Sequence, residues 1–117
     1  MKYKDDYQKI VYDLLSLTPN MNKMDRITEE MDWYADSDTR NFYLWKDQND
    51  NWSGLLGVED KEQNLLIRRL VLVPELFTMD NCFKMLNELE KIYLDKKIVG
   101  SLETAKVCEA WEQSKDE

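Results

Sequence analysis

Histidine is absent from the 117 residues, and its absence excludes several kinds of chemistry. Histidine-based catalytic triads, histidine-ligated zinc and histidine general bases all require the imidazole ring. Only two cysteines are present, Cys82 and Cys108, and no third ligand stands at a metal-type spacing from them. The sequence therefore predicts no metal site.

Basic residues are scarce relative to acidic ones, with 16 Lys and Arg against 24 Asp and Glu and a formal net charge of -8. Binding to a nucleic-acid backbone depends on clustered Lys and Arg, so we expect neither nucleic acid nor an anionic membrane as a partner. The sequence also has no secretory apolar segment at its start and no apolar run long enough to span a bilayer. We therefore expect a cytoplasmic protein with reduced thiols.

The length and apolar content are those of one ordinary domain. Hydrophobic residues make up 43% of the chain and aromatic residues 11%, which is enough to build a core and argues against disorder. We expect a single domain over residues 1–113, followed by a polar tail at residues 114–117.

Two amphipathic helices are predicted in the first third of the chain. Apolar residues recur at steps of three and four over residues 3–15, and Pro19 marks the end of this helix. A second apolar face follows over residues 24–35, and either Asn20 or Asn22 is suited to cap its start.

The period then changes to that of β-strands. Residues 42–45 (FYLW) are dense in β-formers, residues 47–51 are typical of a turn, and residues 52–59 (WSGLLGVE) give a returning strand. A second turn at residues 60–64 leads into LLIRRLVLV at residues 65–73, whose apolar composition predicts a central strand buried on both faces.

Several residues in this sheet have two possible roles. Gly54 and Gly57 mark either a bulge or a close approach of another element. Arg68 and Arg69 should project to opposite faces, and ion pairs with neighbouring acids are favoured over contact with an anionic ligand. Core packing is likewise favoured over stacking on a flat ligand, such as a flavin precursor, for four aromatic residues: Trp33, Tyr34, Trp45 and Trp52.

A loop without glycine follows Pro74 and leads into a helix with an apolar face over residues 82–93. A short strand at residues 98–102 and a last helix at residues 103–113 complete the chain. A strand–helix–strand unit with one short crossover should be parallel, so the order ααβββαβα predicts a mixed sheet. Cys82 and Cys108 fall on apolar helix faces, which indicates buried thiols.

This order resembles the core of the GNAT (GCN5-related N-acetyltransferase) superfamily over nearly the whole chain. The resemblance rests on the two N-terminal helices, the hairpin FYLWKDQNDNWSGLLGVE and the segment IRRLVLVP. More narrowly, LLSLTPN, DTRNFYLWK and GLLGVE are similar to the small RibT proteins encoded in riboflavin operons. The implied fold class is α/β (α+β), a truncated GNAT-like acyltransferase fold without the two last strands that complete the acceptor pocket.

The resemblance also implies where acetyl-CoA would bind. In that superfamily the cofactor lies where two parallel strands diverge, and a loop of pattern Q/R-x-x-G-x-G/A holds its pyrophosphate at a helix N-terminus, where free amides and the helix dipole favour an anion. The strand residues implied to contact the pantetheine arm are Leu70, Leu72 and Val73. The three loop positions fall on Phe77, Asp80 and Cys82.

All three loop positions depart from the superfamily pattern. Phe77 has no donor to offer, and Asp80 brings a negative charge that would repel a phosphate about 4 Å away by ~1 kcal/mol in water and ~4 kcal/mol at a partly shielded surface. Asp80 is better explained as the N-cap of the following helix. The loop is therefore predicted to be a weakened CoA site.

The catalytic residues are also altered. By register, the tyrosine that serves as general acid in many superfamily members is replaced by Cys108, for which burial is the alternative role. Glu59 is the spare carboxylate best placed to act as a base, and a solvated residue at a strand end is its alternative role. No acceptor other than an unspecified small-molecule amine is implied.

Two functional hypotheses follow from these departures. The first is acetyl-CoA-dependent N-acyl transfer to an amine, with weak or lost activity. The second is an inactive binding or accessory module with a GNAT fold, linked to riboflavin metabolism. The strand at residues 98–102 would be an exposed edge, so we expect it to be covered by the last helix or to pair with a second copy in a homodimer.

Overall fold

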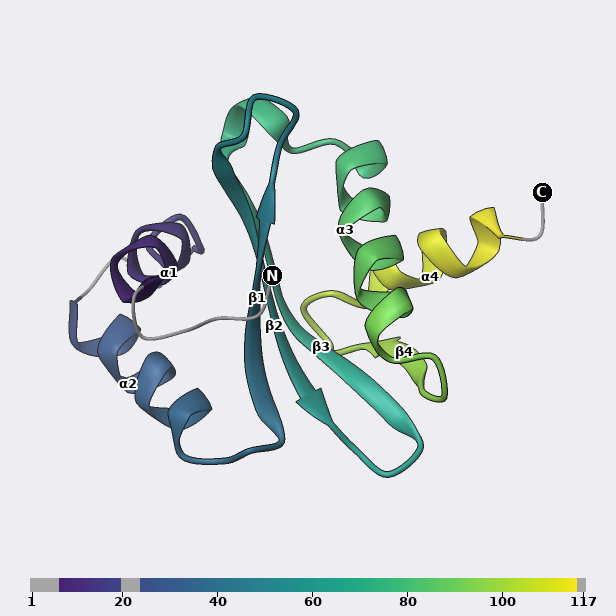
Figure 1. Cartoon of the computed structure of the whole chain (residues 1–117), viewed down its shortest axis with the longest axis horizontal. Coiled ribbons are helices and arrows are strands. Elements are labelled where there is room, and N and C mark those ends of the chain that lie inside the picture. Colours follow the sequence, from purple (N-terminus) through teal and green to yellow (C-terminus); the bar gives the residue numbers. More distant parts are fainter. Residues whose placement is uncertain (1–6, 20–23, 116–117) are drawn as a thin grey trace.

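The computed structural model describes residues 7–19 and 24–115. Figure 1 shows a sheet with α1 and α2 on one side and α3 and α4 on the other. The elements, in chain order, are α1 (Gln8–Leu15), α2 (Met24–Ala35), β1 (Arg40–Lys46), β2 (Trp52–Asp60), β3 (Asn64–Leu72), the short 3-10 helix η2 (Pro74–Leu76), α3 (Met79–Ile92), β4 (Lys97–Gly100) and α4 (Ala105–Ser114).

The predicted order ααβββαβα is confirmed, with η2 as an addition in the loop after β3. Three parts of the sequence-based description lie outside the described residues: the first turn of the first helix, the capping candidates Asn20 and Asn22, and the last two residues of the tail. No helix in the described ranges is long and apolar enough to cross a bilayer.

The four described strands form one sheet in the order β1-β2-β3-β4. β1 pairs antiparallel with β2, β2 antiparallel with β3, and β3 parallel with β4, which confirms the predicted mixed sheet. The predicted turn between β1 and β2 is organised by Asp47, whose carboxylate accepts hydrogen bonds from the amides of Asn49 and Asn51 and from the Ser53 hydroxyl.

A separate hydrophobic core lies on each face of the sheet. The face under α1 and α2 is packed by Val11, Leu14, Leu15, Ile27, Tyr34, Phe42, Leu44, Leu55 and Val71. The face under α3 and α4 is packed by Tyr43, Leu56, Val58, Leu65, Ile67, Leu72, Cys82, Met85, Leu86, Leu89, Ile98, Cys108 and Trp111. Both cysteines are buried, as the sequence predicts.

Gly54 and Gly57 face opposite cores, and each permits a close approach. A Cβ atom on Gly54 would lie 2.8 Å from Cε of Met85, on α3, whereas a Cβ on Gly57 would lie 2.4 Å from Oη of Tyr34, on α2. The register between β2 and β3 also shifts between Gly57 and Val58. Both roles considered for these glycines therefore occur, and Gly57 combines them.

That bulge overturns the prediction that Arg68 and Arg69 project to opposite faces. Gly57 is opposite Arg69 and Val58 is opposite Ile67, so Arg68 is an extra residue on β3. A bulge interrupts the alternation of side chains. Both arginines consequently reach α2, where Arg68 lies over Trp33 and Arg69 pairs with Glu30.

The predicted end of β4 and both predicted ends of α4 are wrong by one or two residues. β4 ends at Gly100 and α4 begins at Ala105, because Thr104 bonds locally: its hydroxyl accepts from the Ser101 amide and donates to the Ile67 carbonyl. Ser114, placed in the tail by its polarity, continues α4, where its hydroxyl donates to the Trp111 carbonyl.

Candidate functional site

The strands β3 and β4 separate partway along their length. Their parallel register runs from Asn64 and Lys97 to Ile67 and Gly100. The Ser101 amide makes one more hydrogen bond, to the Ile67 carbonyl at 3.0 Å, and the chain then turns into the segment before α4. β3 continues through residues 68–72, and within the described ranges no strand pairs with that part of it on the β4 side.

A cavity of about 420 Å³ opens beside this divergence, on the side of the sheet that carries α2. We call it the α2-side pocket, and it is lined by Glu30, Trp33, Arg68, Arg69, Ser101, Leu102 and Glu103. These residues come from α2, from the bulged part of β3 and from the segment between β4 and α4. Sequence reasoning missed Glu30 and Glu103, because residues on three separate elements form no local pattern.

Arg69 links the two sides of the α2-side pocket. Its Nε donates to Glu30 at 2.6 Å and its Nη1 to Glu103, also at 2.6 Å. The hydrogen bond to Glu30 is the main reason that the pKa of Arg69 is raised, so the guanidinium stays charged. The predicted ion pairing of this arginine is confirmed, and the pairs tie α2 to the segment between β4 and α4.

Glu59 lies next to this pocket, and its burial corrects the expectation that it is a solvated residue at a strand end. It is only 8% exposed, and its carboxylate is within 3.2 Å of Arg68, 3.4 Å of Lys61 and 3.7 Å of Arg40. β2 extends to Asp60, so Glu59 is not a solvated strand end. These ion pairs tie the Glu59 carboxylate to β1, to β3 and to the turn between β2 and β3.

Trp33 contacts two of these cations. The guanidinium of Arg40 lies 3.8 Å from the centre of its ring and that of Arg68 lies 4.7 Å away. Arg40 also donates to the Trp33 carbonyl at 3.0 Å. These two contacts help to hold the Trp33 ring at the wall of the α2-side pocket, beside Arg68.

The loop after β3 supplies few side-chain donors. Phe77 is 54% exposed, and the Asp80 side chain is 81% exposed with its carboxylate 3.4 Å from Lys84. Cys82 is fully buried in the core below α3. Of the strand residues, Leu70 is partly buried and Leu72 is buried.

Val73 and the start of α3 differ from expectation. Both backbone groups of Val73 are engaged, because its amide donates to the Ser53 carbonyl at 2.9 Å and its carbonyl accepts from Leu76 at 3.0 Å.

The N-cap of α3 is Thr78 and not Asp80, and the Thr78 hydroxyl accepts a hydrogen bond from the Asn81 amide at 3.1 Å. A residue within the first turn has helical geometry and cannot cap. The negative charge of Asp80, in the first turn, still interacts favourably with the helix dipole.

Cys108 is largely buried. It is buried between α4 and β4 in the same core as Cys82, and burial raises the pKa of both thiols. A buried thiol with a raised pKa has low reactivity. Its placement is that of a packing residue.

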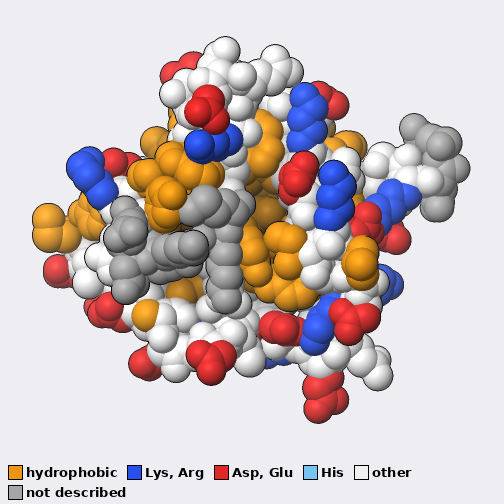
Figure 2. Space-filling model, in the orientation of Figure 1, with side chains coloured by type: hydrophobic (Ala, Val, Ile, Leu, Met, Phe, Trp, Pro, Cys, Tyr) orange, Lys and Arg blue, Asp and Glu red, His pale blue; other side chains and the backbone are white. Residues whose placement is uncertain are grey.

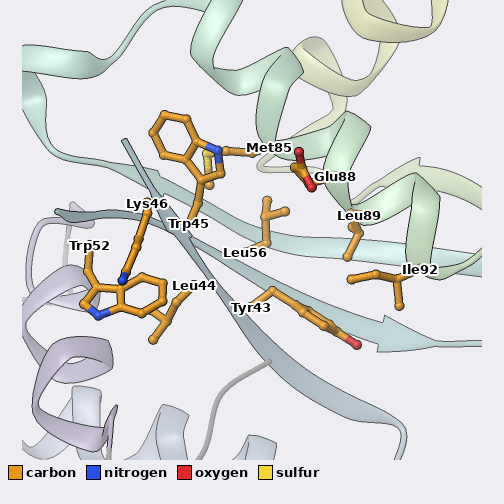
Figure 3. A pocket seen from close by; sticks show the side chains of 10 residues that line it. All are labelled: Tyr43, Leu44, Trp45, Lys46, Trp52, Leu56, Met85, Glu88, Leu89 and Ile92. Carbon is orange, nitrogen blue, oxygen red and sulfur yellow. The ribbon is translucent and has the colours of Figure 1, made fainter. Parts of the chain in front are cut away.

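A second cavity of about 420 Å³ lies on the other face of the sheet, between β1, β2 and α3 (Figure 3). Its floor and walls are mainly apolar, and Figure 2 shows hydrophobic side chains gathered in the hollow beside α3. Trp45, one of the aromatic residues considered for stacking, lies at one end of it and Tyr43 at the other. Tyr34 instead packs in the opposite core, stacked on Phe42 with ring centres 3.9 Å apart.

Within the described ranges no group of three or more acidic residues or cysteines is placed to hold a metal ion.

No protein-family model matches the chain. A Bacillus methanolicus protein named as an uncharacterized N-acetyltransferase in the lysA 3' region is 29% identical over 113 residues, which are 96% of this chain and 93% of that protein. Among solved structures, the aminoglycoside 6'-N-acetyltransferase of Enterococcus faecium matches with a TM-score of 0.63 and 18% identity, over 85% of this chain and 57% of that one.

An aminoglycoside 6'-N-acetyltransferase complexed with coenzyme A matches with a TM-score of 0.61 and 21% identity, over 78% of this chain and 52% of that one. The chain thus spans little more than half the length of these two enzymes. The element order and the mixed sheet define the class: this is the fold of GNAT acetyltransferases. With the name of the bacterial relative, these matches support placement of the chain in the GNAT superfamily.

Proposed function

We propose that this protein binds acetyl-CoA where β3 and β4 diverge and transfers the acetyl group to an amine in the α2-side pocket. The observation that carries the proposal is the end of the parallel pairing at Ile67 and Gly100, after which β3 continues through residues 68–72 with no described strand paired to it on the β4 side. Ligands of open α/β sheets bind beyond the carboxyl ends of diverging strands. The fold match to an acetyltransferase complexed with coenzyme A supports the same cofactor.

The pyrophosphate of the cofactor is held weakly in this proposal. Phe77 offers no hydrogen bond and Asp80 carries the wrong charge, although Lys84 at 3.4 Å offsets part of it. The first amides of α3 and the helix dipole remain as the attractive contribution. Affinity then comes mainly from the pantetheine arm along residues 68–72 and less from the phosphates.

The acyl transfer itself needs a proton acceptor for the amine. Glu103 is proposed for this role, because its side chain is 55% exposed whereas Glu30 on the opposite wall is largely buried. The amine nitrogen attacks the thioester carbonyl carbon, the C–S bond breaks, CoA leaves as the thiolate, and the proton of the amine passes to the Glu103 carboxylate. Arg69 positions that carboxylate through its 2.6 Å hydrogen bond.

A second candidate is an inactive accessory module in the cytoplasm, related to RibT proteins and linked to riboflavin metabolism. It is favoured by the replacement of all three loop positions and by the burial of Cys108, which stands where many superfamily members have a catalytic tyrosine. A homodimer paired through β4 would suit such a module.

Calorimetric titration of CoA separates the two candidates. At a free concentration of 100 times Kd, the ligand should stabilise the fold by ~2.7 kcal/mol, which also raises Tm measurably. Pantetheine and ADP serve as matched half-ligands: we expect pantetheine to bind and ADP to bind poorly. Absence of binding at millimolar CoA would overturn the enzyme proposal and leave the accessory module.

A further inference from the structure

The α2-side pocket is nearly neutral in a chain with a net charge of -8. Its walls carry two arginines, Arg68 and Arg69, and two glutamates, Glu30 and Glu103. A pocket built for an acceptor with several positive charges would be expected to carry an excess of carboxylates, since opposite charges attract in a partly buried site. The balance of charges indicates an acceptor that carries both signs.

The hydrogen bonds of Arg69 are already satisfied by the protein. Its Nε and Nη2 face Glu30 at 2.6 and 3.4 Å, and its Nη1 faces Glu103 at 2.6 Å. The two carboxylates on the far side of the guanidinium would repel an incoming anion. Arg69 is therefore a positioning residue for the two glutamates.

Arg68 is placed differently. Its side chain is 40% exposed, its Nη1 donates to Glu59 at 3.2 Å, and no acceptor within the described ranges is recorded for its Nε or Nη2. The guanidinium carbon lies 4.7 Å from the centre of the Trp33 ring, and this contact restrains the side chain. A guanidinium held in this way presents its remaining N–H groups to a carboxylate.

Glu103 lies in the same pocket and is suited to the opposite charge. It is half exposed and contacts Arg69 through one oxygen, Oε2. Its second oxygen is available to an ammonium group, and the proposed proton transfer requires the amine to lie there. The exposed side chain of Leu102 lines the same pocket.

From this juxtaposition we infer that the acceptor is a small amine that also carries a carboxylate, such as a free amino acid. Arg68 binds the carboxylate while the amine lies against Glu103. The inference rests on the proposed function and specifies its substrate class. A simple diamine would leave the donors of Arg68 without an acceptor and place a second positive charge near the guanidinium.

Matched pairs of acceptors test this inference through CoA release from acetyl-CoA. Each pair differs by one carboxylate: L-lysine and cadaverine, L-arginine and agmatine, L-tyrosine and tyramine. We expect kcat/KM for the amino acid to exceed that of its partner at least tenfold in one or more pairs. Equal or faster turnover of the decarboxylated member in every pair would overturn the inference.

Substitution of Arg68 locates the effect. Arg68→Gln should reduce the discrimination within a pair to under about threefold through a rise in KM for the amino acid, and Arg68→Lys should retain part of it. Lys91→Gln removes an exposed positive charge on α3 and is the control that should change nothing. An unchanged discrimination in Arg68→Gln would also overturn the inference.

Binding measured without the cofactor separates the two proposals. Titration of L-lysine, L-arginine and L-tyrosine into the protein, followed by nuclear magnetic resonance, should shift the Trp33 indole signal in the wild type and not in Arg68→Gln. If CoA fails to bind and these shifts are still seen, the enzyme proposal fails and the ligand class stands. If CoA binds and no amino acid produces a shift or turnover, the enzyme proposal stands and the ligand class is wrong.

Discussion

Gly54 and Gly57 lie three residues apart on β2 and face opposite sides of the sheet, so they allow the packing of the two faces to be compared. Gly54 faces α3 and lies under the end of the flexible Met85 side chain, whereas Gly57 faces α2 and lies under the rigid ring of Tyr34. The Tyr34 hydroxyl is buried and has no hydrogen-bond partner within the described ranges. Burial is also the main cause that raises the pKa of this hydroxyl.

This difference in packing between the α3 face and the α2 face extends to the other residues on each face. The α3 face is packed mainly by aliphatic side chains, together with two aromatic rings, a methionine and two thiols, and the methionine over Gly54 can adjust to small changes. The α2 face adds to its apolar core a set of charged groups in fixed contacts: Glu30, Arg40, Glu59, Arg68 and Arg69. The candidate site is therefore built on the face that adjusts less.

The largest effect is expected from Gly57→Ala. Its new Cβ would lie 2.4 Å from Oη and 2.9 Å from Cζ of Tyr34, so we expect a loss of ~2–3 kcal/mol in the free energy of unfolding. Gly54→Ala meets the flexible end of Met85 at 2.8 Å and Cδ2 of Leu72 at 3.1 Å, both of which can move, and should cost under ~1 kcal/mol. Urea denaturation of both variants measures the contrast, and equal losses would refute the difference between the faces.

Removal of the Tyr34 hydroxyl refines the same comparison. Tyr34→Phe should be neutral or stabilising by ~1 kcal/mol, because an unpaired buried hydroxyl is costly. Combined with Gly57→Ala it should recover part of the loss, since the atom in closest contact is gone. A loss of more than 1 kcal/mol in Tyr34→Phe alone would mean that the hydroxyl has a partner.

The ion pairs of the α2 face should contribute next. Arg69→Gln leaves the largely buried Glu30 without its cation, and we expect a loss of ~1–2 kcal/mol, since both side chains remain partly exposed to solvent. Lys9→Gln, which breaks the exposed pair with Asp13 at 3.0 Å, is the control and should change stability by under ~0.5 kcal/mol. Thermal denaturation at low salt and at 1 M salt should show that the stability lost in Arg69→Gln depends less on salt than the stability lost in Lys9→Gln.

The loop after β3 tests binding with little effect on stability. Phe77→Arg with Asp80→Asn adds a donor and removes a charge, so we expect CoA affinity to rise at least tenfold, or ~1.4 kcal/mol. Stability should change by only a few tenths of a kcal/mol, because Thr78 and not Asp80 caps α3. Glu88→Gln removes an equivalent charge further along α3 and should leave CoA affinity unchanged in the same titration.

The smallest effect concerns alkaline pH on the α3 face. Burial raises the pKa of Cys82 and Cys108 above the ordinary value of 9.0, so the unfolded chain loses these protons first. Stability is then complete below pH ~9 and falls as pH rises above it, by under ~1.4 kcal/mol per pH unit for each thiol. Urea midpoints between pH 8 and 10 should show this slope. The double variant Cys82→Ala with Cys108→Ala should reduce this slope, even though its stability at every pH is lower.

The sequence by itself determined the order of the elements, the β1–β2 hairpin, the parallel pairing of β3 and β4, and the burial of both thiols. Each of these follows from a local pattern: a period of three to four or of two, a turn-forming segment, or a crossover too short for another topology. The same patterns place Phe77 and Asp80 where the loop after β3 passes into α3, because a strand, a loop and a helix succeed one another along the chain.

Only the tertiary structure decided which side chains meet. The bulge opposite Gly57 turned Arg68 to the same face as Arg69, and it depends on the pairing of two strands and not on either one alone. Glu30 and Glu103 lie 73 positions apart in the sequence and meet at Arg69, where they form the α2-side pocket. Contacts between distant elements have no period to detect. Local sequence therefore fixes the elements, and long-range packing fixes the site.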